Sequence, residues 1–133
     1  RKHLKLPEGT RVHFELGRSI VAPCGSLITR VLYVKKGTTR QFAIVDASMT
    51  ELIRPALYKA YHRVENLSSN EPEELYDVVG PVCESSDVFL KGASIDKCHR
   101  GDLMAIRSAG AYGESMASCY NCRPLPPSLF SGE

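Results

Sequence analysis

The stretch Leu27-Ile-Thr-Arg-Val-Leu-Tyr-Val34, followed after a polar connection by Phe42-Ala-Ile-Val45, decides the fold class. Both runs are rich in β-branched and aliphatic residues, which favour strands. The connection Lys35-Lys-Gly-Thr-Thr39 is short, polar and contains glycine, as is typical of a hairpin loop. The sequence therefore predicts a β-hairpin here.

The rest of the chain continues this pattern. Residues 76–82 and 103–106 are further apolar runs of strand length. The polar residues 66–74 are expected to form a surface loop. The sequence predicts a mostly β domain, a barrel or sandwich with short helices.

Few segments of the sequence indicate helices. One short helix is expected to begin at Thr50, with Pro55 in its first turn, and another to cover residues 113–120. Residues 12–15 alternate apolar and polar side chains and end at Gly17, which indicates a short strand and a turn. This first part of the chain differs from the rest and looks like the end of another unit.

The composition is that of a soluble globular domain. The chain has 133 residues, of which 43% are hydrophobic and 24% charged, enough for one domain with its own core. Its 17 basic and 15 acidic side chains are interspersed, so nucleic-acid binding has little support. No apolar run approaches the roughly 20 residues of a membrane span, and no signal peptide is recognisable. We expect neither a nucleic acid nor a membrane as a partner.

The five cysteines, an odd number at wide spacings, favour free thiols in a reducing compartment, so we expect a cytoplasmic protein. Cys119 and Cys122 have the CxxC spacing, but neither a second pair nor a histidine pair at ligand spacing accompanies them. A metal site is therefore not predicted. Cys24, Cys98, Cys119 and Cys122 are expected to be packing thiols.

Four segments place polar side chains among apolar neighbours, and each has an ordinary and a functional explanation. Glu15 to Arg18 is either a strand end with a surface ion pair or a site where Gly17 lets backbone N–H groups approach an anion. Arg54 and Tyr58, four residues apart, share a helix face that is either solvated or holds a carboxylate.

The other two segments leave the same choice open. Cys83 is either a buried structural thiol or a general acid beside Glu84, whose carboxylate would bind an amine. Tyr112, between two glycines, either packs or reaches the phosphate of a ligand with its hydroxyl.

In this order the segments resemble the diaminopimelate decarboxylases, a family of fold-type III pyridoxal-phosphate (PLP) decarboxylases. Phe14-Glu-Leu-Gly-Arg-Ser-Ile-Val-Ala22 resembles the family's EPGR segment. The other matching runs are Asp46-Ala-Ser-Met49, Leu52-Ile-Arg-Pro-Ala-Leu-Tyr58, Asp77-Val-Val-Gly-Pro-Val-Cys-Glu-Ser85, Gly110-Ala-Tyr-Gly113, Met116-Ala-Ser118 and Tyr120-Asn121. They match diaminopimelate decarboxylases more closely than ornithine or arginine decarboxylases, over nearly the whole chain.

The resemblance implies a PLP-binding α/β barrel followed by a β domain, with the active site between them at a dimer interface. Residues 1–22 would be the last strand and turn of the barrel, and residues 23–133 the C-terminal β domain. The family's Schiff-base lysine and Gly-rich phosphate loop would precede position 1, where the sequence lacks the initiating Met. We therefore expect a fragment that is inactive alone.

The resemblance also implies cofactor contacts. Glu15 would keep the pyridine nitrogen of PLP protonated, because a protonated ring is a better electron sink. Gly17 and Arg18 would lie at the cofactor phosphate, and Tyr112 would contact the cofactor from the β domain. Arg18 and Tyr112 would also reach the substrate.

The substrate implied by the resemblance is meso-2,6-diaminopimelate. Arg18, Arg54 and Tyr58 would hold its distal carboxylate, and Glu84 its distal amine. Cys83 would deliver the proton to the α-carbon after carbon dioxide leaves, from a segment that reaches the partner's active site, so a homodimer is implied. Diaminopimelate needs a cation for its distal carboxylate and an anion for its distal amine, and Arg54 and Glu84 supply both. Ornithine has no second carboxylate for the cation to bind.

Two residues depart from the family pattern. Leu16 stands where the family has Pro, and it is expected to loosen the turn. Ser48 stands where Gly is common, and it would strain the backbone if a positive φ were required there.

Two alternatives to this enzyme remain. One is a non-catalytic dimerising or regulatory domain that presents Cys83 and Glu84 to a partner. The other is a related amino-acid decarboxylase or racemase, against which the combination of Arg54, Tyr58 and Glu84 argues.

Overall fold

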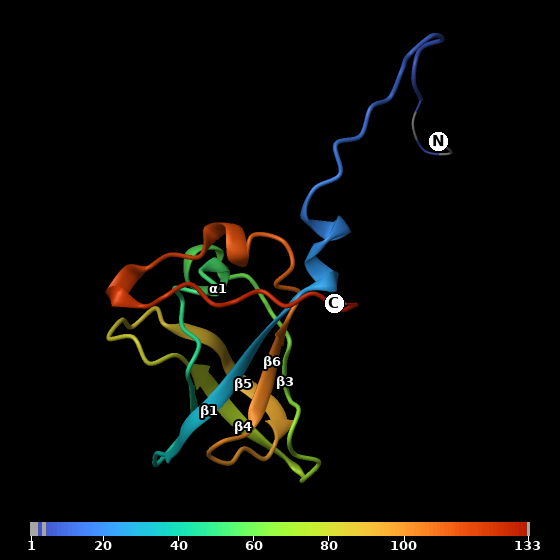
Figure 1. Cartoon of the computed structure of the whole chain (residues 1–133). Coiled ribbons are helices and arrows are strands. Elements are labelled where there is room, and N and C mark those ends of the chain that lie inside the picture. Colours follow the sequence, from blue (N-terminus) through green and yellow to red (C-terminus); the bar gives the residue numbers. More distant parts are fainter. Residues whose placement is uncertain (1–2, 4, 133) are drawn as a thin grey trace.

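The computed structural model describes residue 3 and residues 5–132, and its centre is a six-stranded sheet rolled into a nearly closed barrel (Figure 1). The strands are β1 (Ser26–Lys36), β2 (Gln41–Val45), β3 (Val64–Asn66), β4 (Glu73–Val79), β5 (Val88–Asp96) and β6 (Leu103–Arg107). Their order in the sheet is β3-β6-β1-β2-β4-β5. Among these six strands β2 and β4 pair in parallel and the other neighbours are antiparallel. The predicted mostly β domain is confirmed.

β1 holds the barrel together because it pairs along both of its halves. From Ser26 to Arg30 it pairs with β6, and from Val31 to Lys36 with β2. The register with β2 shifts between Val31 and Tyr33, near the point where the strand changes partner. The predicted hairpin of residues 27–45 is therefore confirmed, with β6 added on its other side.

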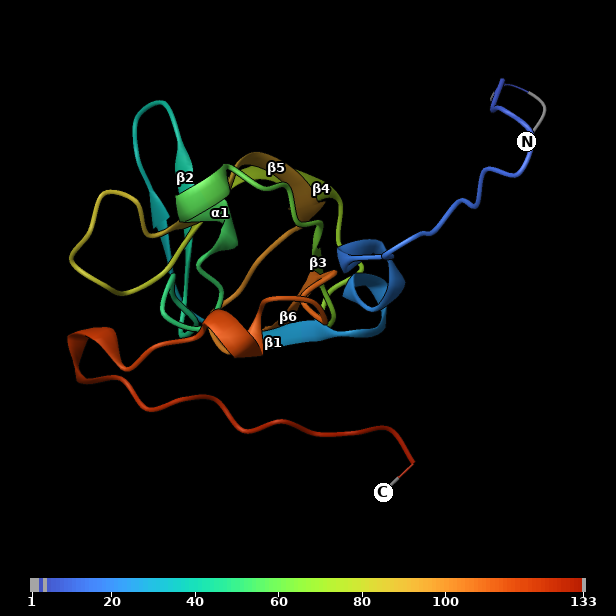
Figure 2. The ribbon, with the colours of Figure 1, turned by 90° about the horizontal axis from the view of Figure 1, so that it is seen from above.

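Apolar side chains fill the inside of the barrel. Seen from above, β4 and β5 lie opposite β1 and β6 (Figure 2). The phenol of Tyr76 is buried among them, and its hydroxyl donates to the carboxylate of Glu74 (2.9 Å) and accepts the N–H of Cys98 (3.2 Å). The core consists of Val31, Ala43, Val45, Ala47, Leu52, Val64, Tyr76, Val78, Phe89, Ala93, Ile95, Cys98, Met104 and Ile106.

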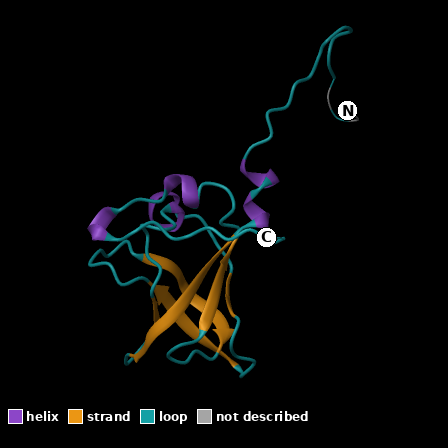
Figure 3. Ribbon diagram, viewed as in Figure 1, coloured by secondary structure: helices purple, strands orange, loops and turns teal. Residues whose placement is uncertain are grey.

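Helical segments are short and gather at one end of the barrel (Figure 3). The one α-helix of the described residues, α1 (Arg54–Tyr58), begins later than predicted, although Pro55 lies in its first turn as expected. The 3₁₀ turns are Arg18–Ile20, Ala22–Cys24, Glu114–Met116 and Tyr120–Cys122. Over the described part of the chain, no helix has the length and apolarity needed to cross a membrane.

Several sequence predictions of local structure are wrong. The helix expected over residues 113–120 is interrupted because Ala117 is extended, with ψ of 151°. The expected loop 66–74 is shorter, because Asn66 belongs to β3 and Glu73 to β4. β5 was not predicted: Gly92, with φ of +61°, breaks the alternation of its side chains, so Phe89 and Ala93 are buried and Lys91 is exposed.

The strand expected at residues 12–15 is absent from the described residues. Residues 11–17 have no regular structure and form an arm that leads away from the barrel (Figure 1). A strand needs a neighbour to take its hydrogen bonds, and among the described residues none pairs with this arm. Residues 1, 2 and 4 of the expected barrel remnant, and residue 133 of the expected β domain, lie outside the described residues.

Two glycines fix the base of this arm against the barrel. Gly25 and Gly110 touch through their backbones, and a Cβ on Gly25 would lie 2.5 Å from the Cα of Gly110. The N–H of Gly110 donates to the carbonyl of Ala22 (3.1 Å), and that of Ala109 to the carbonyl of Gly25 (2.9 Å). The close approach joins the segment after Arg18 to the loop that carries Tyr112.

Gly110→Ala is expected to destabilise the protein by about 1–3 kcal/mol, because the added methyl overlaps the carbonyl oxygen of Val21. Urea denaturation followed by circular dichroism measures the loss. Gly17→Ala is the matched control, since a Cβ there meets nothing within 4 Å. Equal stability of the two variants would contradict the role of the glycine contact.

Candidate functional site

A buried arginine is the centre of the candidate site. Arg54, the first residue of α1, is 9% exposed, and its Nε has no hydrogen-bond partner among the described residues. Burial of an uncompensated charge is costly, so such groups are normally paired. The ordinary explanation, a solvated helix face, is therefore wrong for Arg54.

Two aromatic rings flank this guanidinium. The Cζ atom of Arg54 lies 5.3 Å from the ring centre of Tyr58 and 5.8 Å from that of Tyr112. Both distances are within cation–π range. The predicted pairing of Arg54 with Tyr58 on one helix face is confirmed, and Tyr112 joins them from the loop after β6.

The backbone of Tyr112 is held in an uncommon conformation. Its φ is +62°, in the left-handed region that a bulky residue rarely adopts. The ring is 49% exposed, so packing alone does not account for the strain. Strain of this kind is characteristic of residues fixed for function.

His62, which the sequence did not single out, lies beside these groups. It is 2% exposed, its Nδ1 donates to the carbonyl of Arg107 (2.9 Å), and its Nε2 has no partner among the described residues. Burial lowers the pKa of His62, and the positive charges of Arg54 and Arg18 lower it further. A neutral His62 thus adds no third cation to this end of the barrel.

Cys83 and Glu84 lie in the loop between β4 and β5. Both are exposed, so the buried structural thiol is excluded for Cys83. The hydroxyl of Tyr120 donates to the Oε1 of Glu84 (2.6 Å), which raises the pKa of Tyr120. No role for Tyr120 could be predicted from the sequence, because this contact joins residues that are 36 positions apart.

The structure does not gather every predicted residue. Glu15 and Gly17 lie in the exposed arm, and among the described residues no hydrogen bond or ion pair links them to Arg54, Tyr58 or Tyr112. Arg18, at the base of the arm, is near enough for its charge to act on His62.

Ser48 fits its position without strain. It is fully buried and its φ is not positive. Its hydroxyl donates to Oε2 of Glu51 (2.9 Å), and its N–H donates to the same oxygen (2.6 Å). Burial alone would raise the pKa of Glu51, but these bonds and those from Thr50 and Arg123 hold it below the usual value.

The cysteines other than Cys83 are only partly as expected. Cys98 is buried, and burial raises the pKa of its thiol to about 12. Cys24, Cys119 and Cys122 are exposed, so the prediction that they pack is wrong. Within residues 3 and 5–132, no group of three or more potential ligands could hold a metal ion.

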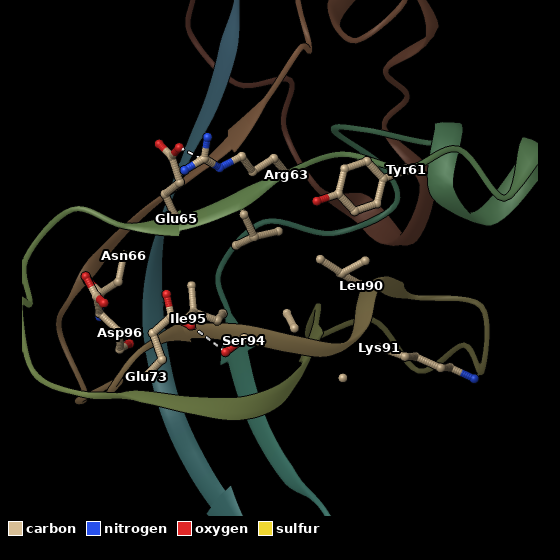
Figure 4. A pocket seen from close by; sticks show the side chains of 13 residues that line it. Tyr61, Arg63, Glu65, Asn66, Glu73, Leu90, Lys91, Ser94, Ile95 and Asp96 are labelled. Carbon is tan, nitrogen blue, oxygen red and sulfur yellow. Dashed lines mark hydrogen bonds and ion pairs between the residues drawn. The ribbon is translucent and has the colours of Figure 1, made fainter.

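A groove of about 470 Å³ lies elsewhere, at the seam between β3 and β5. Figure 4 shows Glu65 of β3 across from Ser94 and Ile95 of β5. Arg63 and Glu65 of this groove form an ion pair (2.9 Å), and the hydroxyl of Ser94 donates to the carboxylate of Glu73. No predicted site residue lines this groove, so it is separate from the candidate site.

Comparisons with known proteins assign the barrel to a family. Residues 19–110 match the model described as pyridoxal-dependent decarboxylase, C-terminal sheet domain. Over 130 residues the chain is 65% identical to the diaminopimelate decarboxylase of Bacteroides thetaiotaomicron, covering 98% of this chain and 34% of that relative. The chain therefore spans about a third of that relative's length.

Two solved structures agree. Diaminopimelate decarboxylase from Helicobacter pylori complexed with L-lysine matches with a TM-score of 0.77 at 53% identity, covering 84% of this chain and 27% of that one. The enzyme of the same name from M. jannaschii in co-complex with L-lysine gives 0.79 at 43% identity, over 83% of this chain and 25% of that one.

His62 predicts a pH dependence of stability. Because its pKa is lower in the folded than in the unfolded chain, the unfolded chain takes up the proton first as the pH falls. The free energy of unfolding is expected to decrease as the pH falls below about 6.5, the ordinary pKa of histidine. His62→Asn should lose this part of the dependence, whereas the exposed His13→Asn should retain it. Identical pH profiles of unfolding for the two variants would contradict the assignment.

Proposed function

This chain belongs to the pyridoxal-dependent decarboxylases as their C-terminal sheet domain, and on that premise we propose that the protein carrying it converts meso-2,6-diaminopimelate to L-lysine and carbon dioxide. The observation that carries the proposal is the buried Arg54 guanidinium with its unpartnered Nε. The 65% identity to a relative named diaminopimelate decarboxylase supports the same reaction.

Arg54 would bind the distal carboxylate of the substrate. A carboxylate would give the buried cation the acceptor that it lacks among the described residues. Tyr58 would flank this carboxylate, and Arg18 would add a second positive charge. A substrate without the distal carboxylate would leave a buried group unpaired, which costs about 1–3 kcal/mol.

Glu84 would bind the distal amine. Its carboxylate is exposed and is oriented by the 2.6 Å hydrogen bond from Tyr120. An ammonium group is a strong donor to such a carboxylate. Arg54 would then bind the carboxylate, and Glu84 the amine, at the distal end of the substrate.

The free donors near the base of the arm fit the phosphate of PLP in charge and in hydrogen bonding. Arg18 is exposed, Tyr112 is half-exposed, and the space beside Gly17 is open. When bound, PLP supplies the electron sink that decarboxylation requires. Glu15 would hold a proton at its pyridine nitrogen, while Gly17, Arg18 and Tyr112 would bind and orient its phosphate.

Cys83 would deliver the proton that replaces the departing carbon dioxide. An exposed thiol on a loop suits this task, because the proton must reach the α-carbon of a substrate held by other residues. In our proposal the loop acts in the active site of a second copy, so the protein is a homodimer. Five free thiols support a reducing, cytoplasmic location.

Residues 1–22 would belong to the preceding PLP-binding barrel, and residues 23–133 to the β domain. Phe14 and Leu16 support this division, since their side chains are 75% and 70% exposed and would be covered by such a neighbour. The same neighbour would give the arm the strand partner that it lacks among the described residues.

The direct test is carbon dioxide release by the full-length protein with PLP. We expect meso-diaminopimelate to be preferred over ornithine by on the order of 10²-fold or more in kcat/KM, because ornithine leaves Arg54 unpaired. Equal or faster turnover of ornithine would contradict the proposed substrate. Absence of turnover on every amino acid would favour the non-catalytic alternative.

Cys83→Ala in the same protein is expected to lower kcat by on the order of 10²-fold, the usual contribution of a general acid. PLP binding, followed by its absorption spectrum, should stay unchanged because Cys83 does not hold the cofactor. Cys24→Ala, another exposed thiol, is the matched control and should retain kcat. Parallel loss of PLP binding and turnover in Cys83→Ala would remove the general-acid role.

A further inference from the structure

The loop that carries Cys83 and Glu84 is shaped by its own hydrogen bonds. The N–H of Glu84 donates to the carbonyl of Val82 (2.8 Å), and the N–H of Asp87 to the carbonyl of Glu84 (3.1 Å). The N–H of Val88 donates to the carbonyl of Ser86 (2.8 Å). This folding leaves both functional side chains exposed.

A buried carboxylate anchors the loop. Asp87 is 3% exposed, and its two oxygens accept N–H groups from two different segments. Oδ2 accepts the N–H of Val82 (2.8 Å), one residue before Cys83. Oδ1 accepts the N–H of Met49 (2.7 Å), in the segment that leads into α1 and Arg54. The side chain of Asp87 therefore links the loop that carries Cys83 to the segment that leads into Arg54.

Gly80 makes room for this carboxylate. A Cβ on Gly80 would lie 2.5 Å from Oδ1 of Asp87, so a side chain there would displace the carboxylate. The N–H of Gly80 also donates to the carbonyl of Asp87 (3.0 Å). Both ends of the loop are thus fixed by Asp87.

The surroundings of Asp87 disfavour its charge. Burial raises the pKa of Asp87, and the charge of Glu51 raises it further, against the backbone hydrogen bonds from Met49 and Val82. A raised pKa means that the folded chain holds the ionised form less well than the unfolded chain does. Its contribution to stability is therefore present at low pH and is lost as the pH rises through the folded-state pKa.

We propose that Asp87 is a positioning residue that places the thiol of Cys83 for proton delivery. The proposal rests on the proposed function, because it assigns Asp87 to residues that act on the substrate. Asp87 itself is buried and touches neither substrate nor cofactor. It acts through the backbone of Val82 and thus through the placement of the Cys83 thiol.

A double-mutant cycle in the full-length protein tests this. Asp87→Asn replaces one accepting oxygen by an NH₂ donor, so one backbone N–H loses its acceptor. We expect kcat for meso-diaminopimelate to fall by on the order of 10²-fold, since small misplacements at a reacting centre have effects of that size. In a Cys83→Ala background the same change should alter the residual kcat by less than about twofold. Asp96→Asn, the same substitution on β5 at a carboxylate that makes no hydrogen bond within the described residues, should leave kcat unchanged.

A readout that needs no turnover keeps the two proposals distinguishable. Alkylation of Cys83 by iodoacetamide, followed by peptide mass spectrometry, should change in rate by about threefold or more in Asp87→Asn, because thiol reactivity depends on local environment. The buried Cys98 should stay unmodified and so report that the fold is intact. If Asp87→Asn does not fold, Gly80→Ala displaces the same carboxylate and should change the rate in the same way.

Three outcomes decide between the proposals. Unchanged alkylation of Cys83 in folded Asp87→Asn would overturn the positioning role, whatever the protein's activity. Equal losses of kcat from Asp87→Asn with and without Cys83 would also overturn it, since Asp87 would then act independently of the thiol. A wild-type protein without decarboxylase activity, combined with altered alkylation, would contradict the proposed function and support the placement of Cys83 by Asp87.

Discussion

A guanidinium that is buried without an acidic partner is the constraint on which this end of the molecule depends. Arg54 is 9% exposed, and the described residues place two tyrosine rings, not a carboxylate, beside it. Cation–π contacts offset about 1–2 kcal/mol of the cost of burying the charge, which is less than a full ion pair would supply. The neutral His62 adds no competing charge, and the contact of Gly25 with Gly110 holds the loop that delivers Tyr112. A bound anion, such as the distal carboxylate in our proposal, would give Arg54 the acidic partner that it lacks among the described residues.

The segment that leads into α1 and Arg54 lies beside the loop that carries Cys83. The segment before α1 contributes Glu51, and the loop after β4 contributes Asp87; both are buried carboxylates that accept backbone N–H groups. Arg123, from the last part of the described chain, donates to Oε1 of Glu51 (3.1 Å). The hydrogen bonds of Asp87 therefore connect the segment that leads into α1 with the loop that carries Cys83.

Sequence reasoning succeeded where the signal is local. β-branched runs indicated β1 and β2, and the spacing of Arg54 and Tyr58 placed them on one helix face. It failed where the result depends on distant contacts. The hydrogen bond from His62 to the carbonyl of Arg107 joins residues 45 positions apart, and no periodicity in the sequence predicts it. Residues 12–15 have strand-like alternation, but pairing is what makes a strand, and none of the described residues pairs with them.

The proposed binding of the distal carboxylate by Arg54 can be tested with Arg54→Met in the full-length protein. Conversion of the meso compound to L-lysine requires reaction at the D centre, so D-lysine keeps that centre and the distal amine and lacks the distal carboxylate. The measurement is kcat/KM for meso-diaminopimelate and for D-lysine. If Arg54 binds this carboxylate, the variant loses on the order of 10²-fold in kcat/KM on diaminopimelate and less than about threefold on D-lysine. Equal losses on both substrates, or no loss on either, would contradict it.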